Sequence, residues 1–424
     1  MPRTHIIGAG VAGLATAVSL AREGRAVTLY EASGQAGGRC RSYRDAKLGR
    51  AIDNGNHLLL SGNAAAMRYL DDIGAGDALI GPASARFPFL DLRTGRRWCL
   101  RPNAGRLPWW TLHADRRVPG TSGWDYLSAL RFAVAGADRT VTDCVGDGGA
   151  LFERFWEPLA VAALNTPARA GAARLLWPVL RDTFARGEAA CRPRIVRNGL
   201  SETFVNPALN FLHRCGAAVR FGHRLRRIAY VGGAASRLRF GAETVVLRGG
   251  DSVVLALPPL ATAGLVPGLS VPEQSHAIVN VHFRLPEPAG LAADLPLLGL
   301  IGGTAQWLFA RGDVVSITVS AADSLATEPA DVIARKAWAD VAAALGFGRD
   351  AVPVCRVIKE RHATFAQTPE GARRRHGTRT KFANLYLAGD WIDTGLPATI
   401  ESAVRSAHMV AHAVAGDGRI GAGE

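Results

Sequence analysis

Three glycines near the start of the chain have the spacing that binds the phosphates of a dinucleotide. Gly8, Gly10 and Gly13 form a G-x-G-x-x-G pattern directly after an apolar run. The first glycine permits a sharp turn, the second lets the backbone approach a pyrophosphate, and the third lets a helix pack closely on a strand. Glu31 places a carboxylate where it can accept hydrogen bonds from both ribose hydroxyls. The residues expected to contact the nucleotide here are Gly8, Gly10, Ala12, Gly13, Glu31 and Ala32.

These glycines can act only if a strand, a turn and a helix position them. Residues 5–7 read as an apolar strand, and a helical pattern follows in which Ala17 and Leu20 face the sheet. Gly24 ends the helix, and residues 26–30 form a second strand. The spacing therefore predicts a βαβ unit with the pyrophosphate at the helix N-terminus, where free N–H groups and the helix dipole favour negative charge. A glycine-rich turn without a ligand is the alternative.

A second group of glycines follows the ribose-binding strand and is joined by arginines. Gly37, Gly38 and Arg39 lie just beyond Glu31, so a second stretch of backbone and a guanidinium can reach the same pyrophosphate. A nicotinamide enzyme has no need of this. The segment resembles the amine oxidase and phytoene desaturase superfamily, whose members bind FAD and carry Gly-Gly-Arg after the first βαβ unit. A solvated arginine loop remains the alternative interpretation.

The C-terminal part of the chain carries a third segment that occurs in the same superfamily. Residues 384–391 read as a buried strand that ends in Gly389 and Asp390, and a helix starts at Ala398 and Thr399. Gly389 permits close approach, and Asp390 can accept hydrogen bonds from ribityl hydroxyls. The N–H groups at the helix start would point toward flavin N1 and the C2 carbonyl, where negative charge gathers on reduction. Three segments in the expected order predict FAD as the cofactor.

Two intervening segments complete the expected cofactor site. Residues 51–60 of this chain match a segment that passes beside the flavin ring in the resembled superfamily. The contacts expected there are Gly55, Asn56 and His57. The backbone near Leu225 is expected to meet the adenine. The fold class implied is α/β, with a Rossmann-like FAD-binding domain built from discontinuous segments and a substrate-binding domain of mixed sheet plus helices. The expected ranges are 1–75, 195–275 and 376–424 for the first domain, and 76–194 and 276–375 for the second.

Composition and charge argue against several other classes. The 424 residues are 48% hydrophobic, which is enough to bury a sizeable core. Six cysteines without C-x-x-C spacing argue against a metal site or a disulfide framework and favour reduced thiols. Neither a signal peptide nor a transmembrane helix is predicted. The formal net charge of +14 comes mostly from dispersed arginines without a recognition motif, so no nucleic-acid partner is expected.

The region of residues 123–188 reads as mainly helical and is rich in large apolar side chains. Within it, Glu157 and Asn165 stand in an otherwise apolar helix, which costs free energy unless both side chains are hydrogen-bonded. The pattern is compatible with a satisfied buried pair and with a role in the site.

Four further stretches resemble the hydroxysqualene dehydroxylase family of bacterial hopanoid pathways: residues 53–57, 155–159, 164–167 and 359–365. The resemblance covers essentially the whole chain and implies a reductive reaction. Loss of water from the allylic alcohol leaves an allylic cation, and hydride from N5 of reduced FAD yields squalene. His57 and Glu157 are then candidate proton donors, and Trp391 and Asp393 lie in the segment expected beside the flavin ring.

Two rival functions remain open. A carotenoid or phytoene desaturase would use the same fold and transfer hydride in the other direction. A non-enzymatic prenyl-binding protein of the same fold would bind no flavin, and the intact nucleotide motifs argue against it. Amine oxidation is disfavoured, because only Lys359 matches the lysine that this branch places on a substrate-domain strand beside flavin N5, and it falls within the dehydroxylase-like motif.

The expected partners are a long-chain isoprenoid substrate, an unidentified electron donor for FAD and an anionic membrane surface. Basic runs such as residues 373–376 would be attracted to such a surface. Trp109 and Trp110 stand in an apolar, arginine-flanked stretch that suits the headgroup boundary, unless both are buried in the substrate domain. We expect a cytoplasmic protein, peripheral on the inner face of the cytoplasmic membrane.

Overall fold

Five parallel strands form the first sheet of the computed structural model, which describes residues 2–420. They come from distant parts of the chain, so the predicted α/β fold class, with a Rossmann-like sheet built from discontinuous segments, is confirmed. Their order in space is β10 (Ala218–Arg220), β2 (Ala26–Tyr30), β1 (Arg3–Ile7), β14 (Ser252–Leu255) and β20 (Leu385–Leu387).

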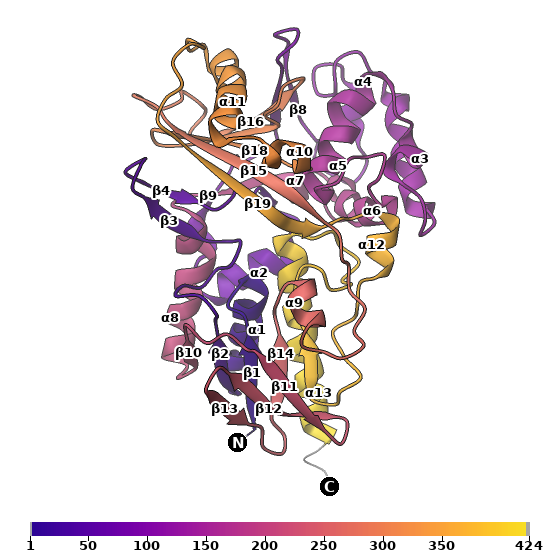
Figure 1. Cartoon of the computed structure of the whole chain (residues 1–424). Coiled ribbons are helices and arrows are strands. Elements are labelled where there is room, and N and C mark those ends of the chain that lie inside the picture. The colour runs from indigo at the N-terminus through magenta and orange to yellow at the C-terminus, as the bar shows by residue number, and fades with distance from the viewer. Residues whose placement is uncertain (1, 421–424) are drawn as a thin grey trace.

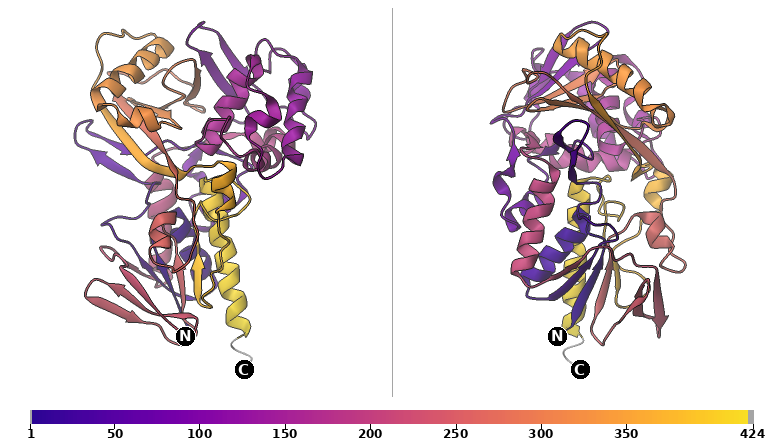
Figure 2. Two further views of the ribbon diagram at one scale, coloured as in Figure 1. Left: turned by 45° about the vertical axis from the view of Figure 1, so that its right-hand side comes forward. Right: turned by 60° about the vertical axis from the view of Figure 1, so that its left-hand side comes forward.

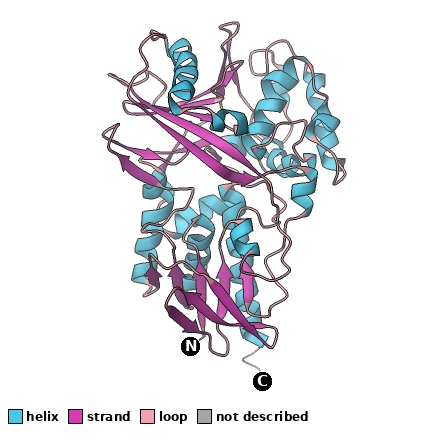
Figure 3. Ribbon diagram, viewed as in Figure 1, coloured by secondary structure: helices cyan, strands magenta, loops and turns pink. Residues whose placement is uncertain are grey.

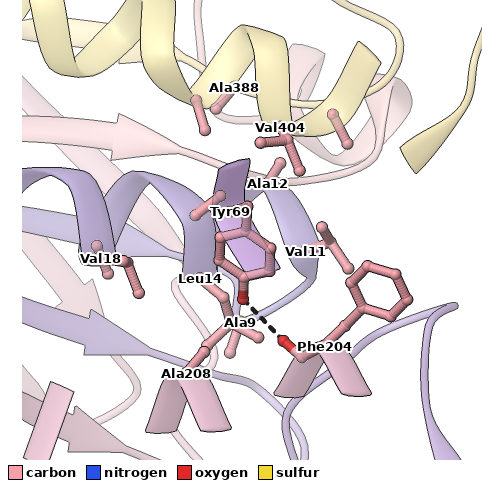
Figure 4. Packing of buried hydrophobic residues seen from close by; sticks show 14 of the residues in the cluster. Ala9, Val11, Ala12, Leu14, Val18, Tyr69, Phe204, Ala208, Ala388 and Val404 are labelled. Atoms are coloured by element: carbon pink, nitrogen blue, oxygen red, sulfur yellow. Dashed lines mark hydrogen bonds between the residues drawn. The ribbon is translucent and has the colours of Figure 1, made fainter. Parts of the chain in front are cut away.

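Helices pack on one face of this sheet through small side chains. Ala12 and Leu14 of the first helix and Val404 of the last belong to one buried cluster, drawn in Figure 4. Tyr69 closes the cluster, and its hydroxyl donates to the Phe204 carbonyl at 2.7 Å. Alanine and glycine let the two long helices approach closely. The helices are α1 (Val11–Arg22), α2 (Ala64–Asp72), α8 (Asn206–Arg214, preceded by a π turn, Ser201–Val205) and α13 (Ile400–Ile420).

A three-stranded antiparallel meander covers the other face of the parallel sheet. Its inner residues Ile228, Leu238 and Phe240 pack against Ile7 and Leu255 of the parallel strands. The elements are β11 (Arg227–Val231), β12 (Ala234–Phe240) and β13 (Glu243–Val246), with the short helix α9 (Pro259–Ala263) after β14.

A seven-stranded mixed sheet lies at the opposite end of the molecule (Figure 1). Helices α10 (Asp323–Thr327) and α11 (Ala330–Leu345) cover one of its faces, and the views in Figure 2 place the other face toward the parallel sheet. The strand order is β19 (Cys355–Phe365), β15 (Ser275–Arg284), β18 (Val314–Val319), β17 (Trp307–Arg311), β16 (Leu297–Ile301), β7 (Phe87–Asp91) and β8 (Arg97–Leu100).

A lobe of short helices lies beside the second sheet, at the upper right of Figure 1. It shares an apolar core with the strands β7 and β16, to which Phe89 and Ile301 contribute. Its elements are the 3-10 helices η2 (Trp109–Leu112), η3 (Gly123–Val134) and η5 (Phe184–Arg186), the π turn η4 (Phe152–Trp156), and α3 (Val141–Val145), α4 (Gly149–Leu151), α5 (Glu157–Leu164), α6 (Ala173–Asp182) and α7 (Glu188–Cys191).

Short strands connect the two ends of the molecule, where Figure 3 shows most strands gathered. Strand β9 pairs with β5 and β6, which lie on either side of α2 in the chain. No helix within residues 2–420 is both long and apolar enough to cross a bilayer. The remaining elements are β3 (Ser42–Asp45), β4 (Arg50–Asp53), β5 (Leu59–Leu60), η1 (Gly76–Ala78), β6 (Leu79–Ile80), β9 (Pro193–Val196) and α12 (Pro369–Arg373).

Candidate active site

The turn between β1 and α1 has the geometry that its glycines predict. Gly8 has a φ of 102°, and a Cβ on Gly13 would lie 1.9 Å from the Gly8 carbonyl oxygen, so both positions require glycine. A Cβ on Gly10, in contrast, would meet no atom of the described residues within 4 Å. The space beside Gly10 is therefore open at the N-terminus of α1, where a pyrophosphate fits.

A second glycine pair lies against this turn. The Gly37 N–H donates to the Ala9 carbonyl at 2.8 Å, and Gly37 pairs with Gly10 in an isolated parallel bridge. Gly37 and Gly38 have φ values of 107° and 57°, which a residue with a side chain rarely adopts. The two glycine segments therefore form one backbone cradle, and their contact with a pyrophosphate stays a prediction.

Arg41 is the second arginine of the glycine-rich segment that is expected to approach the pyrophosphate. Its Nη1 donates to the Gly38 carbonyl at 3.2 Å, whereas its buried Nε has no hydrogen-bond partner among the described residues. A buried guanidinium N–H left without an acceptor costs free energy. A phosphate oxygen beside Gly38 would satisfy it, so these residues fit a dinucleotide.

Glu31 ends β2 beside the first turn, as predicted, and is already hydrogen-bonded within the protein. Its Oε2 accepts from the Ala9 N–H at 2.9 Å, and its Oε1 accepts from the N–H and hydroxyl of Ser33 at 2.8 and 3.0 Å. Ala32 is exposed next to it. The His223 N–H donates to the Glu31 carbonyl at 2.8 Å, which places the chain just before Leu225 at this end of the site.

Arg39 and Asp390 join the N-terminal and C-terminal cofactor segments. The Arg39 Nη2 lies 2.7 Å from Asp390 Oδ1, and its Nη1 donates to the Ala363 carbonyl of β19. The Arg39 side chain is 43% exposed and that of Asp390 only 11%. The Asp390 carboxylate raises the pKa of Arg39. The Arg39 guanidinium therefore stays charged and holds Asp390 in place. Because the Arg39 side chain is partly exposed, it remains accessible to a ligand.

The start of α13 is built by three polar groups. The Ala398 N–H donates to Gln367 Oε1 at 2.8 Å, and Thr399 accepts from the Ser402 N–H at 3.2 Å through its hydroxyl. The Ala398 N–H is thus occupied by the protein, whereas the Thr399 N–H has no partner among the described residues. Gln367, which is fully buried, positions this helix start and was missed because an isolated glutamine carries no sequence signal.

The segment that begins at Asp53, the last residue of β4, is held by hydrogen bonds to Leu200 before α8 and to the seven-stranded sheet. Asp53 accepts from the Leu200 N–H at 2.9 Å and pairs with Arg311 at 2.6 Å. Asn54 donates to Glu360 of β19 at 3.3 Å. The loop with Gly55, Asn56 and His57 is therefore fixed at the junction of the domains.

Polar side chains of the second sheet line the space beneath this loop. Asn56 Nδ2 lies 3.0 Å from the Thr318 hydroxyl, which in turn donates to Asn280 Oδ1 at 2.8 Å. Asn280 also donates to the Asn54 carbonyl at 3.4 Å. The sequence alone did not indicate Asn280 or Thr318, because strand register brings them together.

His57 is neutral in this environment. Burial lowers the pKa of His57 to about 4, although the nearby Asp53 opposes the shift. At neutral pH the ring carries one N–H, so it can donate a hydrogen bond but holds no extra proton.

The other three candidate catalytic residues have structural partners. Glu157 Oε2 accepts from the Ala168 N–H at 3.0 Å, which braces the end of its own helix. Trp391 is 2% exposed and donates its Nε1–H to the Leu257 carbonyl at 2.9 Å. Asp393 accepts from the Gly395 N–H at 3.2 Å in a turn. Within the described part of the chain, none of the three side chains forms a hydrogen bond or ion pair with His57.

Asn165 and Arg375 are buried braces. Asn165 adopts a left-handed conformation at the end of α5 and forms hydrogen bonds with His276, Ala321 and Thr364. These bonds satisfy its buried side chain, as the structural alternative expects. The expectation that the basic run at residues 373–376 is attracted to a membrane surface is wrong for Arg375, because its side chain is 0% exposed. Its guanidinium donates to three carbonyls around Trp391, and burial lowers the pKa of Arg375 to about 10.

Trp109 and Trp110 of η2 are buried to different extents. Trp109 is 56% exposed, whereas Trp110 is 4% exposed and packs edge-on against Tyr126 with ring centroids 5.2 Å apart. The paired interfacial location is therefore wrong for Trp110, and the alternative of two buried rings is wrong for Trp109. No group of three or more His, Cys, Asp or Glu side chains arranged to hold a metal occurs in residues 2–420.

Comparison with known proteins identifies relatives along the whole chain. The family model described as flavin containing amine oxidoreductase matches residues 11–415. A hydroxysqualene dehydroxylase from Rhodopseudomonas palustris is 46% identical over 98% of this chain and 99% of its own length. A second hydroxysqualene dehydroxylase, from Zymomonas mobilis, is 43% identical over 97% of this chain and 98% of its own length.

Solved structures share the fold at low sequence identity. Putrescine oxidase bound to putrescine has a TM-score of 0.70 at 16% identity, with 98% of this chain and 99% of that chain covered. Cyclohexylamine oxidase from Brevibacterium oxydans has a TM-score of 0.71 at 14% identity, with 98% and 99% covered. These similarities establish the fold alone.

Proposed function

The chain belongs to the hydroxysqualene dehydroxylase family within the flavin-containing amine oxidoreductases, and from this premise we propose that it reduces hydroxysqualene to squalene. The observation that carries the proposal is the 46% identity to a hydroxysqualene dehydroxylase over 98% of the chain. The protein is accordingly an FAD-dependent oxidoreductase with an isoprenoid substrate.

The reaction breaks one C–O bond and forms one C–H bond. When bound, reduced FAD supplies the hydride. The hydroxyl leaves as water after it takes up one proton, and the allylic carbon receives the hydride. Because each turnover oxidises FAD, an electron donor must reduce it again. The protein must hold the cofactor, orient the alcohol and exclude water from the cation.

The residues proposed to hold FAD lie in the cradle and around the Arg39–Asp390 pair. The pyrophosphate would lie at Gly10 and Gly38 near Arg41, whose unsatisfied Nε supports this position. Glu31 would accept from the ribose, and the Thr399 N–H would face the flavin. The proposed contacts are Gly8, Gly10, Ala12, Gly13, Glu31, Ala32, Gly37, Gly38, Arg39, Gly55, Asn56, His57, Leu225, Gly389, Asp390, Ala398 and Thr399.

His57 is the residue proposed to contact the departing hydroxyl. Its ring is neutral because of its low pKa, so it would donate a hydrogen bond and leave proton delivery to another group or to water. Glu157, Trp391 and Asp393 are proposed to position the site, since each already serves a hydrogen bond within the fold.

Strand register supports reduction in preference to amine oxidation. Lys359 of β19 lies opposite Val279, whereas Glu360 lies opposite Ile278, so the two side chains point to opposite faces of the sheet. The Lys359 Nζ donates to the Glu328 carbonyl next to α11. Glu360 instead meets Asn54 on the cofactor side. The lysine that amine oxidation would use is therefore directed away.

A flavin spectrum taken without oxygen tests the reaction. The protein is reduced anaerobically, and hydroxysqualene dispersed in detergent is added. We expect the flavin to reoxidise and squalene to appear in equal amount. A carotenoid desaturase would instead bleach oxidised flavin when it receives a more saturated polyprenoid. Unchanged flavin spectra with both substrates would refute the proposal and this alternative.

We also propose that the enzyme works on the inner face of the cytoplasmic membrane without crossing it. A C30 hydrocarbon with one hydroxyl is essentially insoluble in water, so transfer through the aqueous phase would be slow. The support is the nature of the proposed substrate together with the net charge of +14.

A further inference from the structure

Helix η3 has two apolar edges, and the protein buries only one of them. In a 3-10 helix side chains three residues apart lie above one another, so η3 has three edges. Tyr126, Ala129 and Phe132 form the inner edge and join the core of the helical lobe. Phe132 is 1% exposed and packs against Trp156 with ring centroids 5.5 Å apart. This contact fixes which edge faces inward.

The second apolar edge is exposed to solvent. Trp124, Leu127 and Leu130 repeat at the same three-residue spacing and are 77%, 53% and 62% exposed. The third edge carries Asp125, Ser128 and Arg131 and ends in Val134, which is 85% exposed. The exposed edge is therefore a regular feature of the helix and not a single stray side chain.

Residues of η2 and of the loop before it extend the exposed apolar surface. Leu112 of η2 touches the start of η3, since a Cβ on Gly123 would lie 2.7 Å from Leu112 Cδ2. Leu112 and Trp109 are 57% and 56% exposed. We call the whole set the apolar edge, which consists of Leu107, Trp109, Leu112, Trp124, Leu127 and Leu130.

Positive charge accompanies the apolar edge. Arg106, Arg116 and Arg131 lie in the same stretch of chain, and none of them forms an ion pair with another described residue. The acidic side chains between residues 101 and 139 already accept hydrogen bonds or ion pairs from the protein: Asp115, Asp125 and Asp138. Asp115 and Asp138 are paired with Arg101 and Arg373, so cations outnumber unpaired acids beside the apolar side chains.

We propose that the apolar edge docks the enzyme on an anionic lipid bilayer. A bilayer surface accepts tryptophan and leucine below the headgroups and arginine among anionic headgroups, which matches this combination of side chains. The same lobe shares its core with the sheet beside the candidate active site. The inference rests on the proposed function, because a membrane-dissolved substrate is what makes docking useful to this site.

Vesicle co-sedimentation of the flavin-loaded full chain tests the proposal. The probes are vesicles of phosphatidylcholine alone and of phosphatidylcholine with phosphatidylglycerol. We expect the parent to bind the anionic vesicles at least tenfold more tightly, and less so at high salt. The variant Trp124→Ser, Leu127→Ser, Leu130→Ser should lose at least tenfold on both vesicles. The variant Arg106→Ser, Arg116→Ser should lose mainly the preference for anionic lipid.

A matched control uses exposed apolar residues elsewhere. Val231 and Val246 of the meander are 71% and 62% exposed, and the variant Val231→Ser, Val246→Ser should bind as the parent does. Equal binding of the triple variant and the parent would overturn the proposal. So would a parent that binds neither vesicle, which would leave the apolar edge to a protein partner.

A second measurement separates docking from catalysis. With detergent-dispersed hydroxysqualene, the triple variant should reoxidise reduced flavin as the parent does, because the three replaced side chains are solvent-exposed and none is among the proposed site residues. With substrate in anionic vesicles it should be at least tenfold slower. Equal rates from vesicles would overturn the docking proposal and leave the proposed reaction intact, whereas a parent inactive in detergent would count against the reaction itself.

Discussion

Replacing Glu31 by alanine should lower both the stability of the flavin-free protein and its affinity for FAD. The carboxylate accepts hydrogen bonds from Ala9 and Ser33, and these hold the glycine turn. Hydrogen bonds to a charged acceptor contribute about 1.5–3 kcal/mol when buried, and Glu31 is only half-buried. We therefore expect the free energy of unfolding of the flavin-free protein to fall by about 1–2 kcal/mol.

The same variant should also bind FAD more weakly, for a reason separate from its lower stability. Two ribose hydroxyls lose their shared acceptor, which costs about 1–3 kcal/mol. The dissociation constant for FAD should rise by roughly 5- to 150-fold, since each 1.4 kcal/mol is about a factor of ten.

Two assays separate the contributions. Urea unfolding of the flavin-free protein measures the bracing of the turn, and titration with FAD followed by tryptophan fluorescence measures the affinity. Glu23→Ala is the matched control, because Glu23 is an exposed acid at the end of α1 whose side chain forms no hydrogen bond or ion pair with the described residues. An unchanged dissociation constant in Glu31→Ala, at any stability, would refute the assignment of Glu31 to the ribose.

The other predictions concern the turn, the histidines and the lysine. Gly10→Ala should weaken FAD binding in a fluorescence titration while the unfolding of the flavin-free protein stays unchanged, whereas Gly13→Ala should impair both, because its Cβ would lie 1.9 Å from the Gly8 carbonyl oxygen. His282 of β15 is buried, and burial lowers the pKa of His282 from its ordinary value of 6.5 to about 4. Between these two pH values the unfolded chain binds more protons than the folded protein, so stability falls as the pH drops from 6.5 toward 4. This histidine should cost about 2 kcal/mol between pH 7 and pH 5, and urea unfolding of His282→Gln should show a flatter pH dependence than the parent. His57→Gln, which keeps a hydrogen-bond donor, should retain more turnover than His57→Leu at equal flavin content. Lys359→Met should keep the anaerobic flavin reoxidation by hydroxysqualene, and loss of that reaction with normal flavin content would contradict the direction assigned to this lysine.

The nucleotide-binding end of the protein could be predicted from the sequence because its geometry is local. Gly8, Gly10 and Gly13 specify backbone conformations within a few residues, and the neighbouring apolar runs specify the strands and the helix. The order of the Gly37–Arg39 and Gly389–Asp390 segments then identified the superfamily. Positive φ values at Gly8, Gly37 and Gly389 show why glycine stands at these positions.

The polar centre of the site depends on contacts between residues that are distant in the chain. Arg39 pairs with Asp390 across 351 residues, and Asn56 meets Thr318 across 262 residues. No spacing rule encodes such pairs, because they exist only once the parallel sheet and the seven-stranded sheet have packed. The pKa of His57 is of the same kind, since burial by the whole fold lowers it.

The sequence by itself determined the residues that must be glycine, the strands of the first βαβ unit and the family, because these follow from local backbone geometry and from motifs in order. It did not determine which side chains are buried. Trp110 is buried whereas Trp109 and Trp124 are exposed, although all three are tryptophans. Likewise the Arg375 side chain is buried and that of its neighbour Arg374 is partly exposed. That choice was made by tertiary packing, because a side chain is buried only when another element covers it, and in η3 the three-residue period presents two apolar edges to a lobe that covers one.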